Sequence, residues 1–178
     1  MAAVIKFAAS VEIKQPFTDK SDLLAAAIAD NYTGAVDRTI LYDTVWQAIE
    51  MTADPSRNDR RAVIVVTDGI DEESVNHQLA EVVENANESG VPVFTIGLGN
   101  AFIAVLQHLA EETGGQYFIP PTPDALASIY QTIAAILTNQ YIIEFNSISS
   151  GGNTIDLEVE IDRDGDIGLN SKSVTGCD

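Results

Sequence analysis

Basic residues are scarce in this chain. Its 178 residues include 9 Lys and Arg against 27 Asp and Glu, which gives a net charge of −18. Between Arg61 and Arg163 there is no Lys or Arg, whereas fifteen acidic residues occur there. A chain with this charge is repelled by phosphate backbones and by anionic lipid. We therefore expect no nucleic-acid partner, and either a solvated acidic surface or a surface that attracts a basic partner or a cation.

Cysteine pairs and long apolar runs are absent as well. Cys177 is the only cysteine, so an internal disulfide cannot form. The most apolar stretch, Ile129 to Ile143, is interrupted by polar residues and falls short of the roughly 20 apolar residues of a membrane span. We therefore expect no membrane insertion. The first ten residues lack the features of a signal peptide, yet the acidic surface suits an extracellular or cell-surface location.

The apolar residues that are present alternate between strand and helix patterns. Ala62 to Thr67 and Val91 to Ile96 are two largely β-branched runs, which predict strands buried on both faces of a parallel sheet. Apolar residues recur at helical spacing from Leu41 to Ile49. We predict an α/β fold with a doubly wound, mostly parallel sheet and helices on both faces. Further helices are expected to begin at Ser21, Ser74, Asn100 and Thr122.

Both ends of the chain are predicted to be antiparallel. Residues 3–8 and 11–17 are strand patterns separated by a very short connection, which predicts a tight hairpin. Residues 141–146 and 154–162 alternate apolar and polar side chains, and Asp164-Gly165 begins another turn. The C-terminal tail is therefore expected to be a small antiparallel β unit.

Five motifs follow one another in the order known from one protein family. They are Lys6-Phe7 with Pro16-Phe17-Thr18, Thr39 to Asp43, Val63 to Asp71, Val93 to Gly99 and Leu109 to Phe118. Through them the chain resembles a von Willebrand factor type A domain across residues 3–138, and its tail resembles the β segment that follows such domains in many bacterial exported proteins. The resemblance implies a partial type A domain over residues 1–138 and an antiparallel β extension over residues 139–178.

The resemblance also implies a metal site. In that family three loops at the carboxyl edge of the sheet hold a divalent ion, Mg²⁺, Mn²⁺ or Ca²⁺, which binds an acidic side chain of a protein partner. Thr39 matches the threonine of the second loop and Asp68 the aspartate of the third. The Asp-x-Ser-x-Ser sequence of the first loop occurs nowhere in the 178 residues. We therefore expect the site to be incomplete and ion binding to be weak or absent in this chain.

The missing motif belongs to a strand that lies mid-sheet in the family, between the strands that here begin near Ala3 and Ala62. Without it two apolar strand edges would be left open, which natural proteins avoid. We interpret the chain as lacking its own N-terminal portion. A divergent member of the family that pairs those two strands directly is the alternative.

Other interpretations of the residues around Asp68 remain open. Asp68-Gly69 also fits an ordinary turn with no ligand. Asp71, Glu72 and Glu73 are expected to form a solvated helix start rather than to bind metal.

The function that these observations favour is a protein-binding or adhesion module that uses a divalent ion at the sheet edge. The sequence contains no Gly-x-Ser-x-Gly elbow and no phosphate loop, so we predict that the chain is not an enzyme. The main alternative is a structural or scaffolding domain of an exported protein in which Thr39 and Asp68 only shape loops. A phosphoacceptor role for Asp68 is a third possibility, but residues 62–162 contain no lysine to support it.

Overall fold

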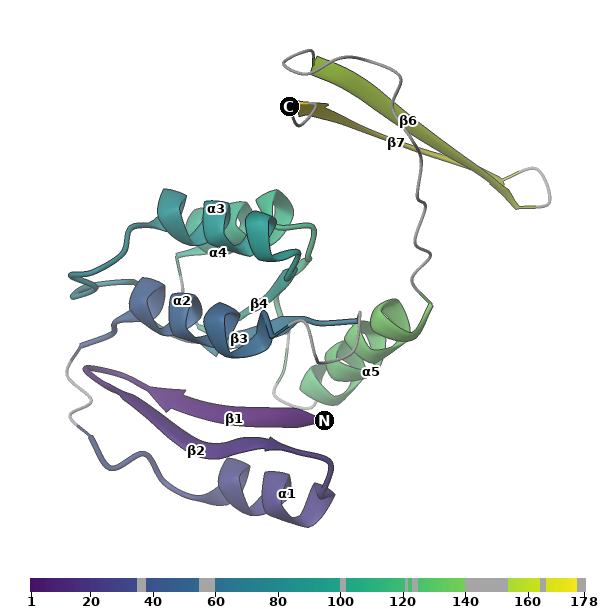
Figure 1. Cartoon of the computed structure of the whole chain (residues 1–178). Helices are drawn as coiled ribbons and strands as arrows, with labels where there is room; N and C mark the ends of the chain where they lie inside the picture. The colour runs from purple at the N-terminus through teal and green to yellow at the C-terminus, as the bar shows by residue number, and fades with distance from the viewer. Residues whose placement is uncertain are drawn as a thin grey trace. The chain divides into compact units, whose positions relative to one another are not determined.

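The computed structural model describes residues 1–34, 38–54, 60–99, 102–120, 122, 125–139, 154–163 and 166–175. The chain divides into two compact units, Met1–Gln140 and Tyr141–Asp178, shown in Figure 1. No helix among the described residues is long and apolar enough to cross a membrane.

The centre of the first unit is a parallel sheet of three strands in the order β3-β4-β5. They are β3 (Val63–Thr67), β4 (Val93–Gly97) and β5 (Tyr117–Phe118). The predicted parallel pairing of β3 with β4 is confirmed, and every residue of β4 is buried as expected. The prediction that β3 is buried on both faces is wrong, because Ile64 lines an open cavity and is 41% exposed. Four helices alternate with these strands: α2 (Leu41–Thr52), α3 (Leu79–Ser89), α4 (Ile103–Glu112) and α5 (Ala125–Thr138).

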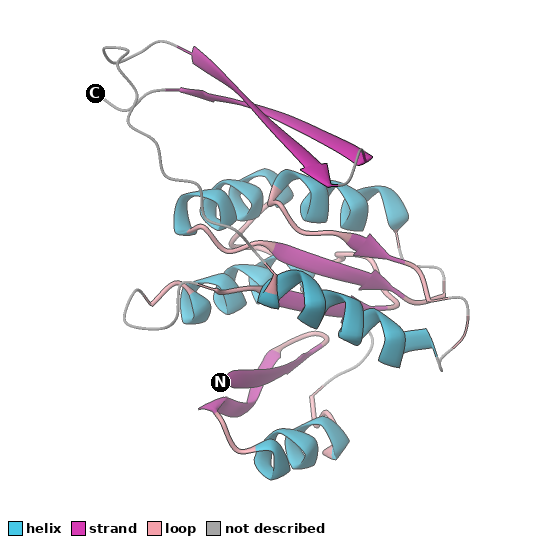
Figure 2. Cartoon of the chain, turned by 90° about the vertical axis from the view of Figure 1, so that its right-hand side faces the viewer, coloured by secondary structure: helices cyan, strands magenta, loops and turns pink. Residues whose placement is uncertain are grey.

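Side chains that alternate along β4 build two separate cores. Val93 joins Val63 and Val65 in a buried cluster with residues of α2, α3 and α4. Phe94 and Ile96 point to the opposite face, where they pack against α5. Helices therefore cover both faces of the sheet, as Figure 2 shows, and the doubly wound α/β prediction is confirmed.

Two helix starts predicted from the sequence need comment. The helix expected from Ser74 begins only at Leu79, because the Ser74 hydroxyl donates to Asp71 at 2.5 Å inside the preceding loop. It ends where expected, at Gly90, whose φ of 61° is the left-handed conformation that glycine adopts most readily. The helix expected from Asn100 begins at Ile103, and Asn100 itself lies outside the described residues.

An N-terminal hairpin precedes the parallel sheet. It consists of β1 (Ala2–Phe7) and β2 (Val11–Thr18), which pair antiparallel as predicted, and the helix α1 (Ser21–Ala29) follows them. Its strand β1 is not paired with β3 among the described strands, so the direct pairing considered from the sequence is not found.

A cavity of about 470 Å³ lies between β1 and β3, which are not paired with each other. Residues of both strands line it together with residues of α2 and α5, so its walls come from the hairpin, the sheet and a helix on each face of the sheet. We call this cavity the strand slot. Its lining includes Val4, Phe7, Val45, Ile64 and Tyr130.

The second unit is an antiparallel hairpin of β6 (Thr154–Arg163) and β7 (Asp166–Thr175). The pairing runs from Thr154 opposite Thr175 to Arg163 opposite Asp166. An antiparallel tail was predicted and is present. The strand predicted at residues 141–146 and the turn residues Asp164 and Gly165 lie outside the described residues.

Candidate functional site

The two residues predicted as metal ligands lie in loops at the carboxyl end of β3. Asp68 follows β3 directly and is exposed, and Thr39 stands two residues before the start of α2. In open α/β sheets ligands bind at this carboxyl edge. Both residues are therefore at the position where a binding site is expected.

Backbone contacts hold the Thr39 loop against the loop that follows Asp68. The Thr39 carbonyl accepts the N–H groups of Glu72 at 2.9 Å and Glu73 at 3.3 Å. A Cβ added to Gly69 would lie 2.9 Å from the Thr39 Oγ1, so that hydroxyl lies close to the Gly69 backbone. Only glycine leaves room for this approach. The structure thus brings Thr39 together with the residue next to Asp68.

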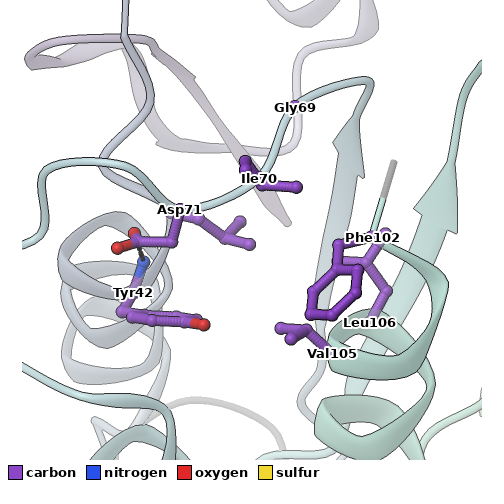
Figure 3. A pocket seen from close by; sticks show the side chains of 8 residues that line it. Tyr42, Gly69, Ile70, Asp71, Phe102, Val105 and Leu106 are labelled. Atoms are coloured by element: carbon purple, nitrogen blue, oxygen red, sulfur yellow. Dashed lines mark hydrogen bonds between the residues drawn. The ribbon is translucent and has the colours of Figure 1, made fainter. Parts of the chain in front are cut away.

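A second set of contacts ties the same loop to the first turn of α2. One oxygen of the Asp71 carboxylate accepts the Tyr42 N–H at 3.0 Å, as Figure 3 shows, and also the Ser74 hydroxyl. The expectation of a solvated helix start at Asp71 is therefore wrong, because its carboxylate binds the first turn of α2 and a residue of its own loop. Arg38 and Glu73 form an ion pair beside it.

Asp43 also links the first turn of α2 to the segment after β3, and the sequence analysis did not single it out. Its carboxylate accepts the backbone N–H groups of Val75 at 3.2 Å, Asn76 at 3.4 Å and His77 at 2.9 Å, and the Asn76 side-chain amide at 3.0 Å. One feature of the sequence could have drawn attention to Asp43. It stands in the first turn of α2, where an acidic side chain stabilises the helix dipole. We call Asp43 and Asp71 the carboxylate clasp.

The clasp leaves two oxygen ligands available for an ion. Within the described part of the chain, neither the Asp68 carboxylate nor the Thr39 hydroxyl makes a hydrogen bond or ion pair, whereas Asp43 and Asp71 are occupied by N–H donors. A carboxylate and a hydroxyl are the hard oxygen donors that Mg²⁺, Mn²⁺ and Ca²⁺ accept. They fit such an ion as part of a ligand set. No group of three His, Cys, Asp or Glu side chains among the described residues could hold one.

A small apolar pocket adjoins these loops. Its volume is about 190 Å³, and Figure 3 shows side chains from α2, from the loop after β3 and from the start of α4 around it. Burial, with the charge of Asp71 as a lesser cause, raises the pKa of Tyr42, so its hydroxyl stays protonated at neutral pH. The lining residues are Leu41, Tyr42, Gly69, Ile70, Asp71, Phe102, Val105 and Leu106.

Comparison with protein families gives one assignment for most of the chain. The family model of the von Willebrand factor type A domain matches residues 1–132. Human Matrilin-3 is 31% identical over 118 residues, which is 62% of this chain and 24% of Matrilin-3. The chain therefore spans about a quarter of the length of this relative.

Solved structures with the same fold come from distant organisms. A von Willebrand factor type A protein from Catenulispora acidiphila superposes with a TM-score of 0.64 at 20% identity, covering 79% of this chain and 34% of the other. Proximal thread matrix protein 1 from the mussel byssus gives a TM-score of 0.61 at 19% identity, with coverages of 76% and 34%. These likenesses concern the fold of the first unit.

Proposed function

Since the chain belongs to the von Willebrand factor type A domain family, we propose that it is an interaction module that captures a protein partner at the carboxyl edge of its sheet. The family is known for protein-interaction and adhesion roles, and its members are generally not enzymes. The observation that supports the proposal is the approach of the Thr39 hydroxyl to the backbone of Gly69, the residue that follows Asp68.

A divalent ion is the proposed link between this edge and the partner. Members of the family commonly bind such an ion, and the Asp68 carboxylate and the Thr39 hydroxyl would hold it here. When bound, the ion supplies an open coordination position for an acidic side chain of the partner. Without it a carboxylate would be repelled, because the chain carries a net charge of −18. One carboxylate and one hydroxyl compete poorly with water, so binding by this chain alone should be weak.

We propose that one further strand completes the site by filling the strand slot. The slot has the open edge of β1 on one side and the open edge of β3 on the other, and apolar side chains from helices on both faces of the sheet line it, which suits a single apolar strand. If that strand runs parallel to β3, its carboxyl end reaches the edge where Asp68 lies. The family resemblance places an Asp-x-Ser-x-Ser loop there, which would supply the missing oxygen ligands.

A structural role without metal is the second candidate. The carboxylate clasp favours it, because the hydrogen bonds of Asp43 and Asp71 by themselves link the loop after β3 to the first turn of α2. In that role Thr39 and Asp68 would only shape loops of a scaffolding domain. For either role we propose an extracellular or cell-surface location, since an acidic surface remains soluble in salty or calcium-rich surroundings.

Titration calorimetry with Mg²⁺ and Mn²⁺ tests the metal proposal. Four proteins are compared: residues 1–178, the same chain preceded by an apolar strand and an Asp-x-Ser-x-Ser loop, and this extended chain with Asp68→Ala or with Glu72→Ala. Glu72 is the matched control, since it is exposed four residues away in the same loop.

We expect one ion per extended chain, bound with a dissociation constant of about 1 mM or tighter, a loss of binding with Asp68→Ala and none with Glu72→Ala. Binding that survives Asp68→Ala would disprove the assigned site. Tight one-to-one binding of the ion by residues 1–178 alone would disprove the claim that this chain lacks part of the ligand set.

A further inference from the structure

Exposed apolar side chains gather on the loops that follow the parallel strands. Surface patches of this kind mark interaction sites more often than isolated apolar residues do. Ile70 and Phe102 are the two that border the small pocket, with 46% and 56% of their surface exposed. The exposed apolar residues on these loops and at the start of α4 are Ile70, Val75, Phe102, Ile103 and Ile119.

The pocket is sized for one side chain. Its volume of about 190 Å³ is below the roughly 300–1,000 Å³ of typical small-molecule sites. Leu41 and Leu106, each 1% exposed, belong to the core and line the pocket. In Figure 3 the rings of Tyr42 and Phe102 lie on opposite sides of it. An apolar side chain placed between them would contact apolar surface on several sides.

The polar groups around the pocket restrict which residues can flank the bound apolar side chain in its own segment. The Tyr42 hydroxyl has no hydrogen-bond partner among the described residues, and as a protonated phenol it can donate to a backbone carbonyl of a bound segment. Asp68 and Glu72 stand two residues before and two after Ile70, both exposed and without an ion pair in the described part of the chain. Arg38, the nearby cation, is already paired with Glu73. The rim is therefore negative.

We propose that this pocket binds one leucine- or phenylalanine-sized side chain from a protein segment that carries Lys or Arg beside it. The inference rests on the proposed interaction role of this edge but not on the metal ion. Charge complementarity decides the occupant: an acidic segment, or a second copy of a chain with a net charge of −18, would be repelled by the rim. An acidic residue farther along the same segment could still reach an ion at Asp68.

Peptide binding measured by fluorescence anisotropy tests the proposal. The probes are fluorescein-labelled Gly-Ser peptides with a central Lys-Phe-Lys, a matched Lys-Ala-Lys and a matched Glu-Phe-Glu, titrated with residues 1–178 in EDTA and again in Mg²⁺. The variants are Phe102→Ala, which removes a wall of the pocket, and Ile103→Ala. Ile103 is the matched control, because it is the adjacent residue, is similarly exposed and does not line the pocket. Far-UV circular dichroism checks that each variant is folded.

We expect the Lys-Phe-Lys peptide to bind in EDTA, and Phe102→Ala to weaken this binding about tenfold, as truncation of an anchor contact does. Ile103→Ala should change it less than about twofold, and both matched peptides should bind at least about tenfold more weakly. If the Glu-Phe-Glu peptide bound as tightly as the Lys-Phe-Lys peptide, the claim that the bound segment carries Lys or Arg would be overturned. Equal effects of the two variants, or no binding of the Lys-Phe-Lys peptide, would overturn the pocket. These results are obtained in EDTA, so they test the pocket separately from the metal proposal, which the calorimetry of the extended chain tests.

Discussion

Removing the half-buried Asp43 carboxylate should destabilise the first unit more than removing either exposed acid of the loop after β3, Asp68 or Glu72. Asp43→Ala takes away the acceptor for the N–H groups of Val75, Asn76 and His77. A hydrogen bond to a charged group contributes about 1.5–3 kcal/mol when it is shielded from water, and less when it is exposed. The carboxylate also complements the N-terminus of α2, which adds about 0.3–1 kcal/mol.

The burial of the three donors decides the size of the loss. Val75 and Asn76 are exposed, so water replaces the lost acceptor there at little cost. His77 is half-buried, and its bond of 2.9 Å is the shortest that Asp43 makes. We therefore expect Asp43→Ala to lower the free energy of unfolding by about 2–3 kcal/mol. Asp43→Asn keeps one acceptor oxygen and should lose about half as much.

Urea unfolding followed by circular dichroism and by tryptophan fluorescence measures this loss. Trp46 is the single tryptophan of the chain, and its ring stacks on His77 with centroids 3.8 Å apart. Its emission should therefore also change in folded Asp43→Ala, because the segment that holds His77 is released. Glu72→Ala, in the loop after β3, is the control and should shift the free energy by less than about 0.5 kcal/mol, because the Glu72 side chain is exposed and makes no hydrogen bond or ion pair among the described residues. A loss for Asp43→Ala as small as that of the control would refute the role of the clasp.

Three further outcomes are expected from other parts of the structure. Gly115→Ala should cost about 3 kcal/mol in urea unfolding, because the added Cβ would stand 2.0 Å from the Val93 carbonyl oxygen; an unchanged midpoint would show that the backbone yields there. Hydrogen bonds to Glu12, first of all from Lys14, lower the pKa of Glu12 from 4.5 to about 2, so its contribution to stability is present above pH 4.5 and is lost as the pH falls towards 2. Glu12→Gln should therefore flatten the dependence of the urea midpoint on pH in this window, and a slope equal to that of the unchanged chain would contradict the assignment. The melting temperature should rise from low salt to about 0.5 M NaCl, since salt screens repulsion among the acids of residues 62–162, and a flat or falling value would contradict this.

Elements whose structure depends on local pattern could be predicted from the sequence. The β-branched run at Val63–Thr67 became a strand of the parallel sheet because Val63, Val65 and Thr67 are buried on one of its faces, although Ile64 on the other face is 41% exposed. Gly90 ended α3 because it takes a positive φ at little cost. The start of α3 could not be predicted in this way. Ser74 has the chemistry of a helix cap, but Asp43 and Asp71 bind the segment around it, and Asp43 lies about 30 residues away.

The family motifs predicted that Thr39 and Asp68 lie in neighbouring loops at the carboxyl edge of the sheet, and the structure brings the Thr39 loop to Gly69. Their role as metal ligands stays a prediction. The pocket beside them could not be anticipated, because Tyr42, Ile70 and Phe102 come from three segments that only the folded chain brings together. No local pattern distinguishes Phe102, which lines this pocket, from Ile103, which does not.

Paramagnetic broadening by Mn²⁺ tests the central claim most directly, namely that Thr39 and Asp68 belong to one ion-binding edge. The sample is the chain completed with the first strand and its Asp-x-Ser-x-Ser loop, labelled with ¹⁵N and titrated with substoichiometric Mn²⁺. The account predicts that the amide signals of residues 39–42 and 68–70 broaden first, and that Asp68→Ala removes this selectivity. Broadening centred on other acidic segments, such as residues 81–88 of α3, or broadening that persists at residues 39–42 after Asp68→Ala, would contradict it.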